Sequence, residues 1–467
     1  MTESRQLSTL EKALQVNLDD RRYGSFAEIG AGQEVVRWFF QAGGAAGTIS
    51  KSMSAYDMQV SDAIYGDCQR YVSRERLEQM LTHEQRLNHK RLREKRSDDT
   101  TFFTFADTVS ARNYFGTNDC HAWLGVQFQH EPGAEDSRIV LHVRLFDDSN
   151  TEQQHAIGIV GVNLLYATFF LSDDPAAMLA SLRENLSPGR VEIDLVDVSG
   201  PAFEGVDNRV LSLRLVELGL TGAAMFCSDG RVLQSAETLR KRSILVQRGR
   251  FRPLTHVNMD MLASASERFI SMLGEDGEHL LPIMEMSMHD LAIDDEVCLK
   301  DFLSRAEVVS TTGYPVLISD FREYHRLAAW LMAHTNRPIA LALGLESLRE
   351  LFNERYYADL SGGVLESFGR LFKDQMSLLV YPIKNAESGE LQTLDDLQLG
   401  SAYQHLLEFL RASGSVIPLD KITESYLDIH SPDVLSMIVE GNERWTECVP
   451  EAVAERIVER RLFGYGT

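Results

Sequence analysis

The second half of the chain alternates short apolar runs with segments of helical periodicity. The apolar runs lie at residues 281–286, 315–319, 338–343 and 378–382. The helical patterns between them cover residues 296–310, 321–335 and 345–355. Short apolar strands that alternate with helices are typical of a parallel sheet buried on both faces. We therefore predict a parallel-sheet α/β region, followed by helices from about residue 401.

The first half mixes the two periodicities. Strand patterns occur at residues 123–128, 139–146, 191–198 and 223–227. Helical patterns occur at residues 8–17, 73–96, 176–185 and 210–218. Residues 23–32 are interpreted as a turn-rich segment before a helix, and the apolar run at 156–171 as a buried strand followed by the start of a helix. This run is about 16 residues long, shorter than the roughly 20 that span a bilayer.

These patterns predict an α/β fold with two domains. The segment 247–256 combines arginines with a proline, and we place the domain boundary near its end. Residues 1–255 then form a mixed α/β domain with an N-terminal helical part. Residues 256–467 form a parallel α/β domain with C-terminal helices.

Composition narrows the class of protein. The chain has 46 Lys and Arg residues and 69 Asp and Glu residues, for a formal net charge of −23. Such a field repels phosphate backbones and anionic lipid, so we expect neither a nucleic-acid nor a membrane partner. The charge leaves two partners possible. One is a small anionic metabolite bound at a local basic patch, and the other is a second copy of the chain in a homo-oligomer. The polar N-terminus and five scattered cysteines predict a cytoplasmic protein with free thiols.

The candidate catalytic residues are Asp320 and Cys120. Asp320 directly follows an apolar strand, where parallel sheets bind ligands, so its carboxylate could hold a ligand or act as a base. The alternative is an N-cap for a helix beginning at Phe321. Cys120 could form a nucleophile pair with His142 or His155, and the alternative is a small buried hydrophobe.

Two further regions could bind an anion. Gly362 and Gly363 precede a helix that carries Arg370 and Lys373, although a plain turn is the alternative. Lys51 lies at the end of a glycine-rich stretch, but a serine replaces the glycine that a P-loop requires before the lysine. The histidine spacing matches no metal motif, so we predict no metal site.

The run EIGAGQ from Glu28 is similar to the first motif of methyltransferases that bind S-adenosylmethionine. Gly30 and Gly32 match the motif, and Glu34 stands where its third glycine is expected. The resemblance implies that Gly30 and Gly32 would contact that cofactor. Nothing else in the sequence identifies a cofactor.

Longer stretches resemble an uncharacterised family of bacterial cytosolic proteins over most of the chain. They are FAEIGAGQEVVRWFFQAGGAAGTISKSMSAYD, NYFGTNDCHAWLGVQF, QQHAIGIVGVNLLYATFF, THVNMDML and GGVLESFGRLFKD. Members carry labels such as TonB-dependent receptor and nicotinamide-nucleotide adenylyltransferase. The first requires a signal peptide and many barrel strands, and the second an H-x-G-H site. The sequence shows neither pattern, so the resemblance implies no activity.

Three functional hypotheses follow. The first is a cytosolic enzyme or metabolite-binding protein that acts on a small phosphorylated or nucleotide-like ligand, based on the expected parallel sheet and its glycine-rich turns. The second is a non-catalytic interaction or scaffold protein, based on the basic face of the helix at 73–96. The third is an S-adenosylmethionine-dependent methyltransferase.

Overall fold

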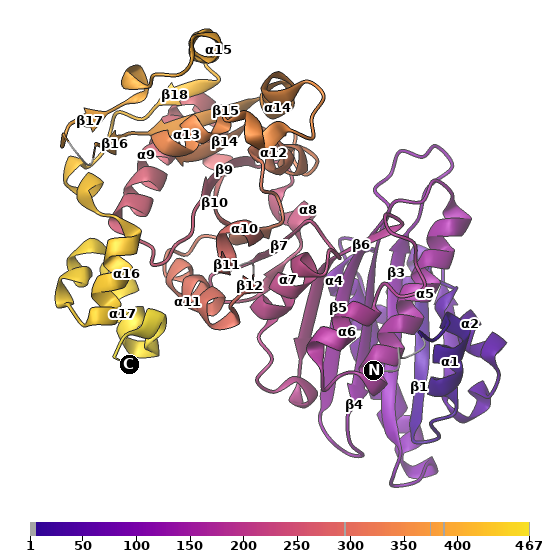
Figure 1. The fold of residues 1–467 in the computed structure, drawn as a ribbon. Helices are drawn as coiled ribbons and strands as arrows, with labels where there is room; N and C mark the ends of the chain where they lie inside the picture. Colours follow the sequence, from indigo (N-terminus) through magenta and orange to yellow (C-terminus); the bar gives the residue numbers. More distant parts are fainter. Residues whose placement is uncertain (1–5, 294–295, 374, 386–387, 467) are drawn as a thin grey trace. The chain divides into compact units, whose positions relative to one another are not determined.

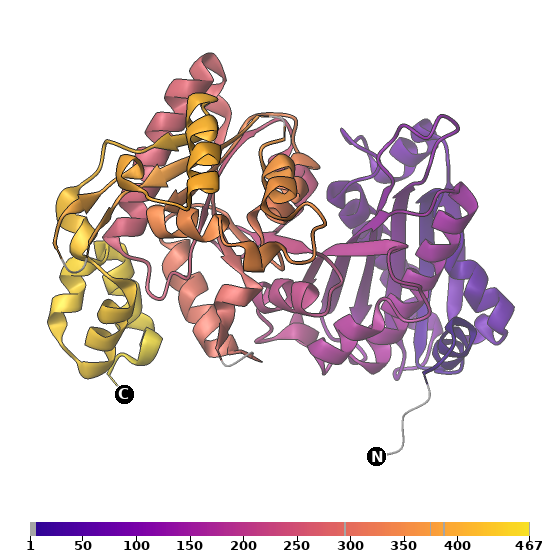
Figure 2. The same ribbon diagram turned by 45° about the horizontal axis from the view of Figure 1, so that its top comes forward.

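The computed structural model describes residues 6–466 except 294–295, 374 and 386–387, and the chain forms two compact units. The units are Met1–Thr221 and Gly222–Thr467. Each is an α/β unit with its own sheet, as the ribbon views show (Figures 1 and 2). The predicted fold class is confirmed: a mixed sheet comes first, then a mostly parallel sheet, then C-terminal helices.

The first unit is built on a six-stranded mixed sheet. The strand order is β2-β1-β3-β4-β5-β6. β1 pairs in parallel with β2 and β3, and the remaining pairs are antiparallel. The strands are β1 (Arg22–Gly30), β2 (Ile49–Ala55), β3 (Thr101–Ser110), β4 (His121–Gln129), β5 (Asp136–Leu145) and β6 (Val191–Ser199).

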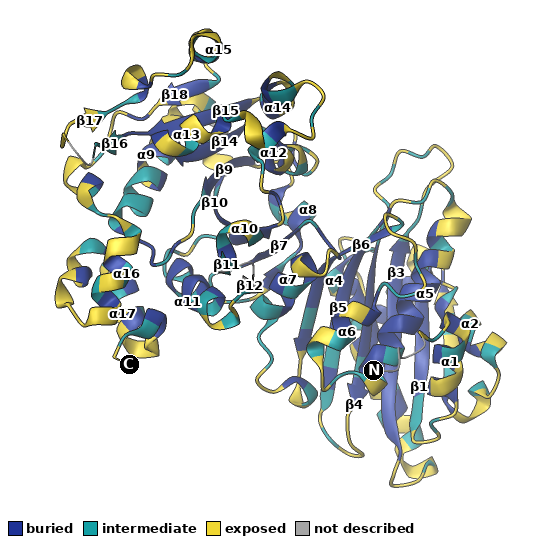
Figure 3. Ribbon diagram, viewed as in Figure 1, coloured by how far each residue is buried: buried dark blue, intermediate teal, exposed yellow. Residues whose placement is uncertain are grey.

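Helices cover both faces of this sheet, whose strands are largely buried apart from the edge strand β2 (Figure 3). On one face Phe26 of β1 packs against Phe39, and Phe103 of β3 packs against Phe169, with ring centroids 5.2 and 5.1 Å apart. The long helix α4 packs on the other face, where Asn88 donates a hydrogen bond to Ser25 of β1. The helices are α1 (Thr9–Asn17), α2 (Val35–Ala42), α3 (Met58–Tyr65), α4 (Arg74–Leu92), α5 (Asn150–Phe170), α6 (Pro175–Ser181) and α7 (Asn208–Glu217).

Two interpretations of the first half are wrong. Residues 156–171, expected to begin as a strand, lie almost wholly in α5, which is buried on nearly every side from Ala156 to Leu165. A helix buried all round has no polar stripe, so its periodicity resembles that of a buried strand. Residues 23–32, expected to be turn-rich, contain most of β1. Its polar Ser25 is buried because Thr104 and Asn88 satisfy its hydroxyl.

The second unit is built on an eight-stranded sheet with the order β18-β15-β14-β9-β10-β13-β7-β8. The six strands from β18 to β13 are parallel, and β7 and β8 are antiparallel at one edge. Numbered along the chain, the parallel strands run 6-5-4-1-2-3, which is the doubly wound order. The strands are β7 (Ala223–Phe226), β8 (Val232–Leu233), β9 (Ser243–Arg248), β10 (Leu280–Ser287), β13 (Val316–Ser319), β14 (Ile339–Gly344), β15 (Met376–Tyr381) and β18 (Val416–Pro418).

The order of these strands reverses between β9 and β14. The chain runs outward from β9 through β10 to β13, then returns to place β14 on the other side of β9. Ligands of open α/β sheets bind outside the carboxyl ends of the strands at such a reversal. The helices are α8 (Ser235–Leu239), α9 (His256–Leu273), α10 (Met288–Leu291), α11 (Leu299–Ser310), α12 (Tyr324–Met332), α13 (Leu345–Leu351), α14 (Gly363–Leu371), α15 (Ser401–Ala412), α16 (Ser431–Glu440) and α17 (Glu451–Arg460).

The four apolar runs predicted as parallel strands are β10, β13, β14 and β15. The sequence analysis places the domain boundary at residue 255, whereas the compact units divide between Thr221 and Gly222. β7, β8 and β9 precede residue 255 and pair within the second sheet. Two short antiparallel pairs complete the unit, β11 (Ala292–Ile293) with β12 (Glu296–Val297) and β16 (Ile383–Lys384) with β17 (Leu391–Gln392).

Candidate functional site

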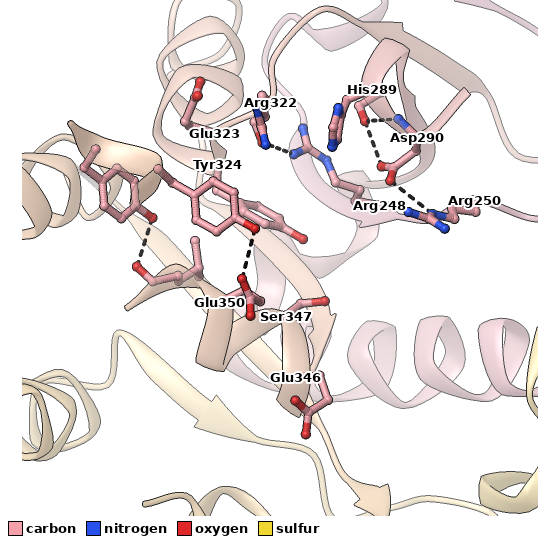
Figure 4. A pocket seen from close by; sticks show the side chains of 15 residues that line it. Arg248, Arg250, His289, Asp290, Arg322, Glu323, Tyr324, Glu346, Ser347 and Glu350 are labelled. Atoms are coloured by element: carbon pink, nitrogen blue, oxygen red, sulfur yellow. Dashed lines mark hydrogen bonds and ion pairs between the residues drawn. The ribbon is translucent and has the colours of Figure 1, made fainter. Parts of the chain in front are cut away.

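A pocket of about 480 Å³ lies at the carboxyl ends of the parallel strands in the second unit. Its walls come from the loops that follow β9, β10 and β13 and from α13 with the turn after it. The pocket therefore borders the reversal of strand order between β9 and β14, where the topology favours a ligand. Figure 4 shows the side chains that line it.

An ion pair between Arg248 and Glu285 forms the floor of the pocket. The two residues are opposite each other on β9 and β10, and the guanidinium makes two hydrogen bonds of 2.6 and 3.0 Å to the carboxylate. Ser319 donates a third hydrogen bond to Glu285, at 2.5 Å. Arg248 also donates to the carbonyl oxygens of Phe321 and Arg322, at 2.7 and 2.9 Å. One guanidinium thus ties together the ends of three strands.

The Arg248 guanidinium is a fixed charge. Burial alone would lower the pKa of Arg248, but the Glu285 carboxylate more than offsets this, so the pKa is raised. Arg248 is 9% exposed and Glu285 is fully buried. Because each charge neutralises the other away from solvent, the pair shapes the pocket floor and adds little net charge to the pocket.

The other cations of the pocket are available to a ligand. Arg322 is exposed, lies over the ring of Tyr356 at 5.3 Å and forms no ion pair with the described side chains. Arg250 is 73% exposed, and its contact with Asp290 is long, at 3.4 Å. The N-terminus of α12 lies beside them, and the side chain of Glu323 makes no capping hydrogen bond there to described residues. Helix N-termini favour negative charge.

Carboxylates occupy the rest of the lining. Asp290 follows β10, and Ser287 donates a hydrogen bond to it at 2.7 Å. Glu346 and Glu350 lie on α13, and Glu350 accepts a hydrogen bond of 2.9 Å from the Tyr356 hydroxyl. In Figure 4 the arginines and Asp290 lie at one side of Tyr324, and the two glutamates lie at the other. The pocket is therefore bipolar, with one region suited to an anion and another suited to hydroxyl groups.

Asp320, the leading sequence candidate, lies two residues before the pocket lining begins on the same loop. Its side chain is exposed. The alternative role as a helix cap is wrong, because α12 begins at Tyr324 and its N-cap is Glu323. The backbone amide of Asp320 donates to the carbonyl of Gly222 at 3.0 Å, which fixes the start of the loop.

Cys120 is half-buried against the core of the first unit, and its thiol approaches the carbonyl of Asn118 at 3.6 Å. In the structure His142 has other partners. Its ring nitrogens lie 3.0 Å from a ring nitrogen of His121 and 2.5 Å from the carboxylate of Asp194. Burial, with the neighbouring His142, lowers the pKa of His121 to about 4. The expected pairing of Cys120 with His142 is thus replaced by a His–His–Asp chain.

The Gly362–Gly363 turn does precede a helix, α14, but the chain's own carboxylate occupies its N-terminus. Glu366 accepts a hydrogen bond of 2.8 Å from the Gly362 amide and one of 2.6 Å from Arg370. These contacts place Gly362 and Arg370 around one glutamate, while Lys373 is exposed. Gly363 has φ of 53°, a left-handed conformation that favours glycine, in keeping with the simple-turn alternative.

Lys51 lies on β2 and pairs with Glu84 of α4, which also accepts a hydrogen bond of 2.9 Å from Tyr65. This contact holds the helix to the sheet edge. The lysine therefore already has a buried carboxylate as its partner.

Gly30 and Gly32 lie in the turn between β1 and α2. A Cβ at Gly32 would come within 2.0 Å of the Asp107 carboxylate, so a residue of the protein itself explains this glycine. Glu28, on the strand before the turn, accepts hydrogen bonds from the amides of Val35 and Val36 at 2.9 and 3.4 Å. Burial raises the pKa of Glu28 to about 8.

The sequence analysis missed most of the pocket. The arginine-rich segment after residue 247 was used as a domain boundary, although it follows β9 directly. None of the lining residues is among the candidates that the sequence analysis names. The sequence did contain one signal for the pocket, an arginine-rich turn that directly follows an apolar run.

Among the residues that the structure describes, no group of three or more His, Cys, Asp or Glu side chains is placed to hold a metal ion. No helix in the described part of the chain is long and apolar enough to cross a membrane.

Part of the chain resembles known structures. One is the competence/damage inducible protein CihA from Agrobacterium tumefaciens, with 18% identity and a TM-score of 0.26, covering 35% of this chain and 98% of that one. A CinA superfamily protein from Klebsiella pneumoniae has 11% identity and a TM-score of 0.27, with 35% and 98% covered. A Vibrio parahaemolyticus protein provisionally described as a nicotinate-nucleotide adenylyltransferase has 12% identity and a TM-score of 0.21, with 48% and 96% covered. No protein-family model and no curated protein matches the sequence.

Proposed function

We propose that the second unit binds a small phosphorylated metabolite in the pocket at the carboxyl ends of its parallel strands, as a binding protein or as an enzyme acting on that metabolite. One observation carries the proposal: Arg322, Arg250 and the N-terminus of α12 line one pocket, which borders the reversal of strand order in a doubly wound sheet. The strand order supplies the location, and the guanidinium of Arg322, which pairs with no carboxylate of the described residues, supplies the charge.

The chemistry of these groups suits a phosphate. A guanidinium offers several N–H donors in a planar fork that matches phosphate oxygens. The backbone amides at the start of α12 add further donors and a partial positive charge. Since the whole protein carries a net charge of −23, long-range attraction for anions is weak, and affinity must come from these local contacts.

The other two hypotheses lack comparable geometry. For the methyltransferase, the close approach of Asp107 explains Gly32 without a cofactor. For the scaffold protein, the exposed face of α4 remains the only support, and nothing in the structure indicates a partner for it.

Replacing Arg322 with alanine is expected to weaken binding of a phosphorylated ligand by about 10- to 150-fold, because a charge-assisted hydrogen bond contributes about 1.5–3 kcal/mol. Calorimetric titration with inorganic phosphate, ribose 5-phosphate and nucleoside monophosphates would measure this. Arg326→Ala is the matched control, because Arg326 lies on α12, close to Arg322 in the sequence but outside the pocket lining. An equal loss in both variants, or no binding of any phosphorylated compound to the wild type, would overturn the proposal.

A further inference from the structure

The position of Asp290 within the doubly wound sheet narrows the class of ligand. In sheets of this order, phosphate groups lie at the loop after the first strand, and a carboxylate at the end of the second strand hydrogen-bonds the ribose hydroxyls. Here the first strand is β9, followed by Gly249 and Arg250, and the second strand is β10, followed by Asp290. Both loops line the pocket.

The Asp290 carboxylate is held in place and keeps free acceptor capacity. Ser287 donates its hydroxyl to one oxygen at 2.7 Å and accepts the Asp290 backbone amide at 3.1 Å. Arg250 approaches the other oxygen only at 3.4 Å. The side chain is 20% exposed, so a ligand can reach it. A carboxylate has about four acceptor positions, so it can bind the two hydroxyls of a ribose diol while keeping its contact with Ser287.

The phosphate-binding part differs from that of a dinucleotide site. The loop after β9 reads GRFRPLT, without the glycine-rich fingerprint that lets a pyrophosphate approach a helix. The N-terminus of α9 is closed by its own capping box, in which Thr255 and Asn258 satisfy each other's amides. A phosphate must therefore use Arg322, Arg250 and the start of α12.

Charge balance then favours one phosphate over two or three. Glu285 neutralises Arg248, which leaves Arg322 for a ligand, together with Arg250 once the ligand displaces its 3.4 Å contact with Asp290. A phosphate monoester carries about −1.5 to −2 charges at neutral pH, which two guanidinium groups balance. Further phosphates would face the carboxylates of Glu346 and Glu350, whose ion-pair partners Arg349 and Arg355 lie outside the pocket lining. The cavity of about 480 Å³ also lies in the lower part of the range for small-molecule sites, roughly 300–1,000 Å³.

We propose that the pocket selects a ribonucleoside 5′-monophosphate, with Arg322 and Arg250 on the phosphate and Asp290 on the ribose hydroxyls. This inference rests on the proposed function of the same pocket. Asp290 is then the residue that distinguishes ribose from deoxyribose. The nucleobase lies toward Tyr324 and Tyr356, which line the same pocket.

Calorimetric titration of the full chain tests this with the four ribonucleoside 5′-monophosphates, their 2′-deoxy forms and their 5′-triphosphates. We expect at least one monophosphate to bind ten or more times tighter than its 2′-deoxy form and its triphosphate. The 2′-deoxy form lacks a hydroxyl that donates to Asp290, and the triphosphate adds an unbalanced charge. Asp290→Asn should bring the ribo and deoxy affinities within about threefold, since an amide oxygen has fewer acceptor positions. Asp433→Asn, at an exposed aspartate of α16 outside the pocket, should leave the ratio unchanged.

The outcomes separate this inference from the proposed function. Equal binding of ribo and deoxy forms, or tighter binding of triphosphates, would overturn the inference while ribose 5-phosphate still binds. If the Asp290→Asn variant still discriminates fully between the ribo and deoxy forms, Asp290 does not bind the ribose hydroxyls. If that variant fails to fold, the ribo-to-deoxy ratio of the wild type still decides the ligand class. Binding of no phosphorylated compound would reject the proposed function itself.

Discussion

Replacing Arg248 with methionine should lower the melting temperature of the second unit by roughly 6–20 °C, because breaking a buried ion pair costs about 3–5 kcal/mol and each kcal/mol shifts a domain of this size by about 2–4 °C. The Glu285 carboxylate would be left fully buried, with Ser319 as its remaining side-chain donor. The carbonyl oxygens of Phe321 and Arg322 would also lose their donor. Thermal unfolding followed by circular dichroism would measure the shift.

The double variant Arg248→Met with Glu285→Met is the control. Removing both charges leaves no uncompensated ion, so most of the lost stability should return, as is common when apolar residues replace a buried pair. If the double variant is as unstable as the single variant, the cost lies in the lost packing and carbonyl contacts. A shift below about 3 °C in the single variant would show that the pair contributes little, as exposed pairs do.

The same pair shows which parts of the fold the sequence could predict. β10, β13, β14 and β15 were found because each is a continuous apolar run, which strands buried on both faces require. β9 was missed because its apolar part is short and ends in Gln247 and Arg248. Taken alone, these two polar residues are typical of a loop. Only the partner Glu285, 37 residues later, shows that the arginine lies inside a sheet.

The sequence analysis and the structure place the candidate site at the same edge of the sheet but on different residues. The rule that ligands bind at the ends of parallel strands selected the loop after β13, and with it Asp320. Which side chain of that loop enters the pocket depends on its path, and Arg248 sets that path by binding the carbonyls of Phe321 and Arg322. Such long-range contacts leave no local pattern in the sequence. The turn at Gly362 did offer a local signal, a glutamate four residues later that caps the helix.

In the first unit, the turn that resembles a methyltransferase motif covers two buried carboxyl groups. Glu28 and Asp107 are opposite each other on the parallel strands β1 and β3. Burial raises the pKa of Glu28 to about 8, although the amides of Val35 and Val36 act to lower it. Burial, and then the Glu28 charge, raise the pKa of Asp107 well above its usual value. Glu28 therefore holds a proton at neutral pH that it would release in an unfolded chain.

This predicts a marked loss of stability with rising pH. Below about pH 4.5 both the folded and the unfolded chain keep the Glu28 proton, so its contribution to stability is fully present. Between about pH 4.5 and 8 only the folded state keeps it, so the free energy of unfolding falls by about 1.4 kcal/mol per pH unit, in total on the order of 5 kcal/mol. Above pH 8 the folded state also releases the proton and the loss is complete.

Glu28→Gln should remove this dependence and make the first unit several kcal/mol more stable than the wild type at pH 8.5, with little difference at pH 4.5. The glutamine is neutral at every pH, and its carbonyl oxygen can still accept the shorter hydrogen bond, from the amide of Val35. Urea unfolding of both proteins at the two pH values measures the effect. Glu131→Gln, on an exposed hairpin, should keep the wild-type pH dependence. If Glu28→Gln and the wild type lose stability in parallel between the two pH values, Glu28 is ionised in the folded protein. The glycine turn would then cover a carboxylate stabilised by the N-terminus of α2 and not a protonated pair.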